Sequence, residues 1–152
     1  MRQTFLPLLF FLHLFIGCKQ HQEQKKTPEQ LRSELLAQES RSPLDYLELE
    51  EAVLSPQTKE VRKASLFKKA KYEPDGVLIE GFLNNKATLA TFKDITLKVS
   101  YYSKTKSILR QKNFVLYEYF GPGSTNRLSI KDYPPEDWNS FNVEVVKADW
   151  SP

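Results

Sequence analysis

Apolar and polar residues alternate with a period of two through the middle of the chain, and this pattern constrains the fold most. Ile95, Leu97, Val99 and Tyr101 fall on one face of an extended segment, and polar side chains fall on the other. Several further short segments carry strand-forming residues in the same way. The strands that we expect cover residues 77–83, 92–101, 108–109, 114–120, 126–130 and 141–146, after a first irregular strand within residues 45–54.

Turn-forming residues separate these segments. They are Asn84-Asn85, the Gly-Pro-Gly-Ser stretch at 121–124 and the Tyr-Pro-Pro-Glu stretch at 133–136. Six or seven short strands without a helical period among them predict an all-β fold, an antiparallel β-sandwich over residues 43–152. The pattern leaves open whether residues 55–71 form a hairpin or a helix.

A short helix is expected before the strands, over residues 27–42. Thr27 suits the N-cap, Pro28 the first helical position, and Gln30 completes a capping box. Pro43 ends the pattern. The helix carries three leucines at helical spacing, so we expect it to pack on the domain, with a partner-binding helix as the alternative: these are Leu31, Leu35 and Leu36.

The N-terminal residues 1–17 have the character of a secretory signal peptide. Arg2 precedes an apolar run over residues 5–16, which Gly17 closes. A run of this length is short for a membrane span, although a retained anchor or a buried helix is an alternative. Cys18 follows as the one cysteine of the 152 residues, which excludes an internal disulfide and a multi-cysteine metal site.

Residues 14–18, Leu-Phe-Ile-Gly-Cys, resemble the lipobox of bacterial lipoproteins. The resemblance implies cleavage between Gly17 and Cys18, acylation of Cys18 with fatty acids such as palmitate, and attachment to a membrane; an ordinary signal beside an incidental cysteine is the alternative. Residues 18–26 would form a flexible tether, because 19–26 contain no apolar residue. With Lys19 after the cysteine and no acid-rich stretch, the resemblance implies an outer-membrane lipoprotein facing the periplasm.

The strand region resembles a second family, the small immunoglobulin-like domains of the FxLYD type. The resemblance covers residues 77–148 and rests on the segments 79–87, 92–102, 121–124 and 141–145. It implies that the expected sandwich is immunoglobulin-like. Residues 43–47, Pro-Leu-Asp-Tyr-Leu, also resemble small lipoproteins of Bacteroidetes-type bacteria. These motifs indicate a fold, and a fold by itself does not define a function.

Catalytic and cofactor chemistry finds little support in the sequence. No histidine or cysteine follows His21, which leaves no Ser-His-Asp triad, no Cys-His pair and no nitrogen or sulfur metal ligands in the expected domain. An acid–base pair of carboxylates is the remaining route to a hydrolase. We expect a protein that is not an enzyme and uses no cofactor or metal, and the weighed carboxylates are Glu48, Glu50, Glu51, Asp132, Glu136 and Asp137.

Positive charge is concentrated in residues 59–71, where six basic residues face one acid, Glu60. The net charge of +3 for the whole chain is too small to indicate nucleic-acid binding. Leu66, Phe67 and other apolar residues interleave with the basic ones. The segment is a candidate contact for an anionic surface, or a solvated hairpin whose charges block edge pairing; its basic residues are Lys59, Arg62, Lys63, Lys68, Lys69 and Lys71.

Aromatic residues on the expected strands offer a second candidate surface. They would form either a sugar-binding platform or part of the core: Tyr101, Tyr102, Tyr117, Tyr119, Tyr133, Trp138 and Trp150. The sequence thus predicts a membrane-anchored envelope lipoprotein whose sandwich is a non-enzymatic structural or interaction module with an envelope protein as partner. The alternative is a periplasmic module that binds glycans or an anionic glycolipid through residues 59–71 and exposed aromatics.

Overall fold

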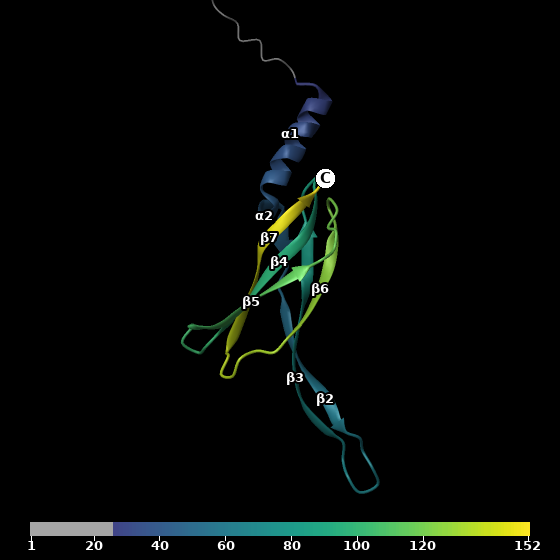
Figure 1. The fold of residues 1–152 in the computed structure, drawn as a ribbon, viewed down its shortest axis with the longest axis vertical. Helices are drawn as coiled ribbons and strands as arrows, with labels where there is room; N and C mark the ends of the chain where they lie inside the picture. The colour runs from purple at the N-terminus through teal and green to yellow at the C-terminus, as the bar shows by residue number, and fades with distance from the viewer. Residues whose placement is uncertain (1–25) are drawn as a thin grey trace, which may run out of the picture.

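The computed structural model describes residues 26–152, which form two short helices and seven strands (Figure 1). The order along the chain is α1 (Pro28–Arg41), α2 (Pro43–Tyr46), β1 (Leu47–Leu49), β2 (Val53–Arg62), β3 (Lys71–Asn85), β4 (Thr91–Tyr102), β5 (Ile108–Leu116), β6 (Thr125–Asp132) and β7 (Ser140–Ser151). No helix in this part of the chain has both the length and the apolar character needed to cross a membrane.

The strands form two antiparallel sheets, so the predicted all-β sandwich is confirmed. In the first sheet β3 is central: β1 and β2 pair with one of its edges, and β6 pairs with the other. The second sheet has the order β5-β4-β7. Strand β4 therefore lies between two neighbours, which fits its regular alternation of apolar and polar residues.

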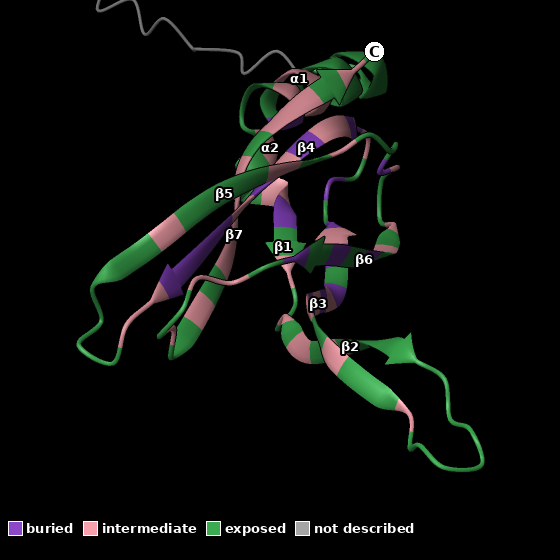
Figure 2. Ribbon diagram, turned by 60° about the horizontal axis from the view of Figure 1, so that its bottom comes forward, coloured by how far each residue is buried: buried purple, intermediate pink, exposed green. Residues whose placement is uncertain are grey.

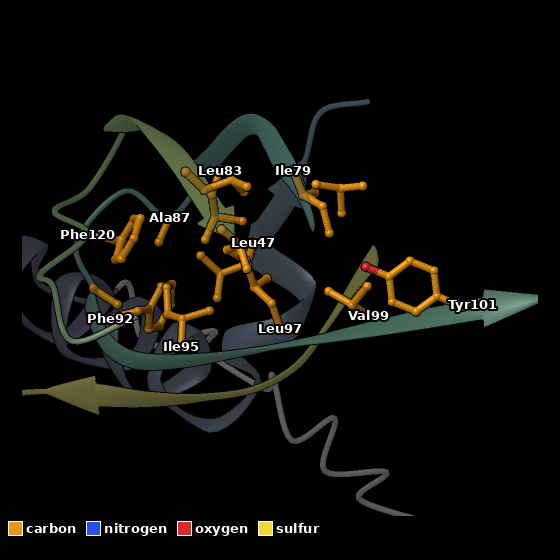
Figure 3. Packing of buried hydrophobic residues seen from close by; sticks show 14 residues of the cluster. Leu47, Ile79, Leu83, Ala87, Phe92, Ile95, Leu97, Val99, Tyr101 and Phe120 are labelled. Carbon is orange, nitrogen blue, oxygen red and sulfur yellow. The ribbon is translucent and has the colours of Figure 1, made fainter. Parts of the chain in front are cut away.

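The hydrophobic core lies between the two sheets. Ile95, Leu97 and Val99 point from one face of β4 toward Ile79 and Leu83 of β3, as Figure 3 shows, and all five side chains are fully buried. Loop residues close one end of this core, where aromatic and small side chains pack together. These are Ala87, Ala90 and Phe120 of the loops, together with Phe92 at the start of β4.

Helix α1 begins where the sequence predicts, but its leucines contact the domain only in part. Thr27 and Gln30 form the reciprocal capping box, with distances of 3.2 Å and 2.9 Å between donor and acceptor. The expected leucine stripe covers the domain only in part, because Leu31 is 54% exposed whereas Leu36 packs against the core. Pro43 does not simply end helical structure, since it opens α2.

Several expected boundaries are wrong. The irregular strand expected within 45–54 is divided into the end of α2, the short β1, and the start of β2. The two segments expected at 108–109 and 114–120 are one strand, β5, which ends at Leu116. The turn expected at Asn84-Asn85 is the end of β3, because Asn85 uses its side chain to hold the loop that follows.

Residues 55–71, left open by the sequence, belong to the β2–β3 hairpin, which projects beyond the sandwich at the end opposite α1 (Figure 1). The projection begins at a register shift in which Pro56 pairs with Val77 and Thr58 with Pro74. Gly76 lies in this shift with φ +79°, and a Cβ there would stand 2.4 Å from the carbonyl oxygen of Asp132. Glycine is thus required where the hairpin leaves the sandwich.

Candidate functional site

The outer part of the β2–β3 hairpin, residues 58–72, is the candidate functional site, and we call it the basic hairpin. Every residue from 58 to 69 is exposed, as the continuous green of this region in Figure 2 shows. Its two arms pair with each other from Thr58–Pro74 to Arg62–Lys71. Strand β6 pairs with β3 only from Val77 onward, so within residues 26–152 no third strand pairs with the projecting arms.

The structure brings together all six basic residues that the sequence singles out. Lys59 and Arg62 lie on β2, Lys71 opens β3, and the other three, Lys63, Lys68 and Lys69, lie in the connection between the arms. They lie on one projection because the two arms pair in antiparallel fashion, which places residues about ten positions apart in the sequence opposite one another.

Most of this positive charge is not paired within the described chain. Lys71 contacts a carboxylate, with its Nζ 2.9 Å from Oε1 of Glu73. Arg62 donates a hydrogen bond to the carbonyl oxygen of Lys69 at 3.2 Å, which joins the two sides of the connection and leaves the guanidinium charge unneutralised. Among residues 26–152, the other five basic residues of the hairpin make no ion pair. The hairpin is therefore a positively charged projection.

A tight turn closes the hairpin. Ser65 and Lys68 exchange two backbone hydrogen bonds, in which each N–H donates to the other residue's carbonyl at 2.8 Å and 3.2 Å. Leu66 and Phe67 occupy the two central positions and are 96% and 94% exposed. We call these two residues the apex pair. The sequence shows them among basic residues, but only the turn places them at the extreme end of the hairpin.

A second charged cluster lies inside the sandwich around Asp132. The side chain of Asp132 is buried and accepts hydrogen bonds from Tyr101 Oη at 3.0 Å, Arg110 Nη2 at 2.8 Å and Lys112 Nζ at 3.2 Å. Burial alone would raise the pKa of Asp132, but the backbone N–H of Tyr133 and these side chains outweigh it and lower the pKa. Burial and the neighbouring carboxylate raise the pKa of Tyr101. This cluster of hydrogen bonds and ion pairs between side chains joins β4, β5 and β6.

Sequence reasoning missed two buried polar residues that fix the loop after β3. Asn85 donates from Nδ2 to the carbonyl oxygens of Ala90, Phe120 and Gly121 at 2.8–3.0 Å. Glu39 of α1 accepts from the backbone N–H groups of the same loop at 2.7–2.8 Å, and its three donors are Thr88, Leu89 and Ala90. An Asn pair reads as a turn and a helical Glu reads as solvated, so neither carries a local signal of burial.

The carboxylate of Glu39 is charged in the folded protein. Burial alone would raise the pKa of Glu39, but the three backbone hydrogen bonds outweigh burial and hold the pKa below its ordinary value. The helix is thus attached to the sandwich by a buried anion bound to backbone amides.

The seven aromatic residues weighed as a sugar-binding platform or as part of the core are divided between the core and the surface. Tyr101 is fully buried, and the ring of Trp138 packs edge-on against it with centroids 5.8 Å apart. Both therefore belong to the body of the domain. Four of the seven are exposed, and they are distributed over the β5–β6 connection, the β6–β7 connection and β7: Tyr117, Tyr119, Tyr133 and Trp150.

The other carboxylates weighed from the sequence serve local contacts or lie on the surface. Glu48 pairs with Lys86, and Glu50 Oε1 accepts from Asn84 Nδ2 at 2.9 Å. Glu50 and Glu51 line a shallow cleft between the β1–β2 connection and β7. Within residues 26–152 no group of three His, Cys, Asp or Glu side chains is arranged to hold a metal ion.

The predicted lipid attachment at Cys18 and cleavage after Gly17 lie outside the described residues. No protein-family model, curated protein or solved structure matches the chain. The candidate site accordingly rests on the geometry of the basic hairpin.

Proposed function

We propose that the chain is an envelope lipoprotein, attached to the outer membrane through acyl groups on Cys18 and facing the periplasm. Its β-sandwich would serve as a non-enzymatic module that contacts a partner through the basic hairpin. The lipobox-like residues 14–18 support the anchor, and two or three acyl chains suffice for stable attachment where one does not. The FxLYD-type resemblance fits a small extracytoplasmic domain of this kind.

The observation that carries the proposal is the position of α1 and the basic hairpin at opposite ends of the sandwich (Figure 1). The 14 residues of α1 extend about 21 Å, and the 15 residues of β3 extend about 50 Å. A chain held at its N-terminus would therefore hold the hairpin away from its own anchor. This arrangement suits a spacer that presents a contact element.

The acidic residues support a structural rather than a hydrolytic role for the sandwich. Asp132 is bound by Tyr101, Arg110 and Lys112, so its carboxylate already has its partners. Glu48 is engaged by Lys86. A general acid and base must instead converge on a reacting group.

Metabolic labelling with palmitate tests the anchor. The wild-type chain should incorporate label, and Cys18→Ala should remain an unlabelled precursor. Absence of label from the wild-type chain would refute the lipoprotein proposal.

A photo-crosslinking residue at position 67 tests the contact element in intact cells, with position 117 as the matched exposed aromatic control. Equal crosslinking from both positions would argue against the basic hairpin as the contact element.

The second candidate function is binding of a glycan or an anionic glycolipid, and the unpaired charge of the basic hairpin favours it. Lys68→Glu with Lys69→Glu should abolish binding of envelope glycans by the mature protein. Lys104→Glu with Lys106→Glu changes the same charge on the β4–β5 connection and should leave binding intact. Absence of binding by the wild-type protein at millimolar glycan would eliminate this candidate.

A further inference from the structure

The turn at the end of the basic hairpin is unusual in its composition. The central positions of a tight turn usually hold Gly, Asn, Asp or Pro, each of which favours the turn conformation or its solvation. Here they hold Leu66 and Phe67, neither of which has a positive φ. No requirement of the turn explains two large apolar side chains at this point.

Packing does not explain the apex pair either. Leu66 and Phe67 do not belong to the hydrophobic cluster of the described domain, and almost their whole surface faces solvent. Exposed apolar surface of this kind is unfavourable in water and is typical of an interaction site when polar residues surround it. The apex pair therefore calls for an apolar environment outside the domain.

The residues that surround the apex pair carry positive charge. Lys63, Lys68 and Lys69 lie within three positions of it along the chain, followed by Arg62, so cationic side chains border the two apolar ones on both arms. Glu60 is the one acid between residues 59 and 71. The complementary surface would have an apolar interior beneath a layer of negative charge.

We infer that the hairpin tip docks on the surface of an anionic phospholipid bilayer. Leu66 and Phe67 enter the boundary between head groups and acyl chains, and the surrounding lysines and arginine contact lipid phosphates. This inference rests on the proposed function for the role of the hairpin as the contact element. It adds the partner, which is a lipid surface.

The shape of the tip favours a bilayer over an acidic protein. A convex pair of side chains needs a matching apolar groove on a protein partner, whereas a bilayer accommodates any projecting apolar group. Five of the six basic residues also make no ion pair within residues 26–152, so they can bind phosphate without first losing an ion pair. Because the tip lies opposite α1, a chain anchored at its N-terminus would dock on a second membrane (Figure 1).

Capture of one set of vesicles by another tests this inference. The mature protein is purified from cells and incorporated into neutral phosphatidylcholine vesicles, and fluorescent acceptor vesicles containing phosphatidylglycerol are added. We expect the acceptors to be captured, and neutral acceptors to remain free. Leu66→Ser with Phe67→Ser should reduce capture by about tenfold or more, as should Lys63→Gln with Lys68→Gln.

Matched variants elsewhere on the surface serve as controls. Tyr117→Ser with Tyr119→Ser removes two exposed aromatic side chains, and Lys104→Gln with Lys106→Gln removes two charges; both should retain capture. Raising the ionic strength should weaken capture by the wild-type protein.

The outcomes separate the inference from the proposed function. Flotation of the protein with the first vesicles, before acceptors are added, reports the anchor. Incorporation without capture, capture of neutral vesicles to the same extent, or capture unaffected by the apex substitutions would each overturn the docking inference. If the protein does not incorporate into the neutral vesicles, the proposed anchor is refuted. Docking is then tested separately, by comparing the flotation of the wild-type protein and the same variants with anionic vesicles. Crosslinking from position 67 to an acidic protein, without vesicle capture, would also overturn the docking inference.

Discussion

The two halves of β3 differ sharply although they belong to one continuous strand. From Val77 to Asn85 the strand pairs with β6 along one edge up to Asn84 and with β2 and then β1 along the other, and its side chains alternate between the core and the other face. From Lys71 to Gly76 it pairs only with β2, and most of its side chains are exposed. Gly76, with its positive φ, marks the boundary.

This difference separates the part of the molecule that provides stability from the part that is available for contact. The inner half supplies Val77, Ile79 and Leu83 to the core, whereas the outer half and β2 support the basic hairpin. Substitutions in the two parts should therefore have different consequences. The inner part should govern the free energy of unfolding, and the outer part should govern binding.

The largest effect is expected in the core. Leu97→Ala removes a fully buried side chain between the sheets and should lower the free energy of unfolding by about 2–5 kcal/mol. Val61→Ala shortens an exposed apolar side chain of the basic hairpin and should change it by less than about 0.5 kcal/mol. Urea unfolding followed by circular dichroism measures both. Similar losses for the two variants would remove the distinction between the regions.

A buried polar contact should give the next largest effect. Asn85→Ala leaves three carbonyl oxygens without their side-chain donor and should lower the free energy of unfolding by about 3 kcal/mol. Asn84→Ala is the matched control, because the side chain of Asn84, the preceding residue, makes one exposed hydrogen bond, to Glu50. Thermal unfolding compares the two, and a smaller loss for Asn85→Ala than for Asn84→Ala would contradict the role of Asn85.

The free energy of unfolding should depend on pH through two buried carboxylates, Glu39, which attaches α1, and Asp132, which joins β4, β5 and β6. The pKa values of Glu39 and Asp132 lie below their ordinary values of 4.5 and 3.8, so the unfolded chain takes up protons first as the pH falls. Their stabilisation is complete above those ordinary values and is lost as the pH falls through the lower native pKa values.

Glu39→Gln tests this dependence. It should lower the free energy of unfolding at neutral pH by about 1–2 kcal/mol and reduce the loss on acidification. Glu34→Gln alters an exposed carboxylate of the same helix, paired with Lys26, and should do neither. Acid titration of stability gives the comparison, and parallel curves for wild type and Glu39→Gln would refute the account of Glu39.

The smallest effect on stability is expected at the tip. Leu66→Ser with Phe67→Ser should change the free energy of unfolding by less than about 0.5 kcal/mol, because neither side chain packs on the domain. Differential scanning calorimetry measures this. A loss of several kcal/mol would indicate that the apex pair has a structural role.

The sequence predicts the regular parts of the molecule and misses its irregular contacts. Strand β4, expected at residues 92–101, extends from Thr91 to Tyr102, because its apolar and polar residues alternate regularly from Ile95 to Tyr101. The outer half of β3 has no apolar alternation and contains Pro74, so the sequence does not predict it as a strand. A proline is tolerated there because, in the part of the chain that the structure describes, the edge of β3 away from β2 is unpaired before Val77.

The candidate site was likewise predictable only in part. Composition identifies the six basic residues between Lys59 and Lys71, since charge is visible without a fold. The exposure of the apex pair depends on the pairing of Ser65 with Lys68, which depends in turn on the register of β2 against β3. Glu39 and Asn85 bind backbone groups from other elements, and no local pattern reports such long-range partners.

Amide hydrogen exchange along β3 tests the division between the two regions and the role of the hairpin together. The mature protein in neutral vesicles should show strong protection from Val77 to Asn85 and weak protection from Lys71 to Gly76. Addition of anionic vesicles should increase protection in the basic hairpin alone. Uniform protection along β3, or an unchanged hairpin in the presence of anionic vesicles, would contradict the account.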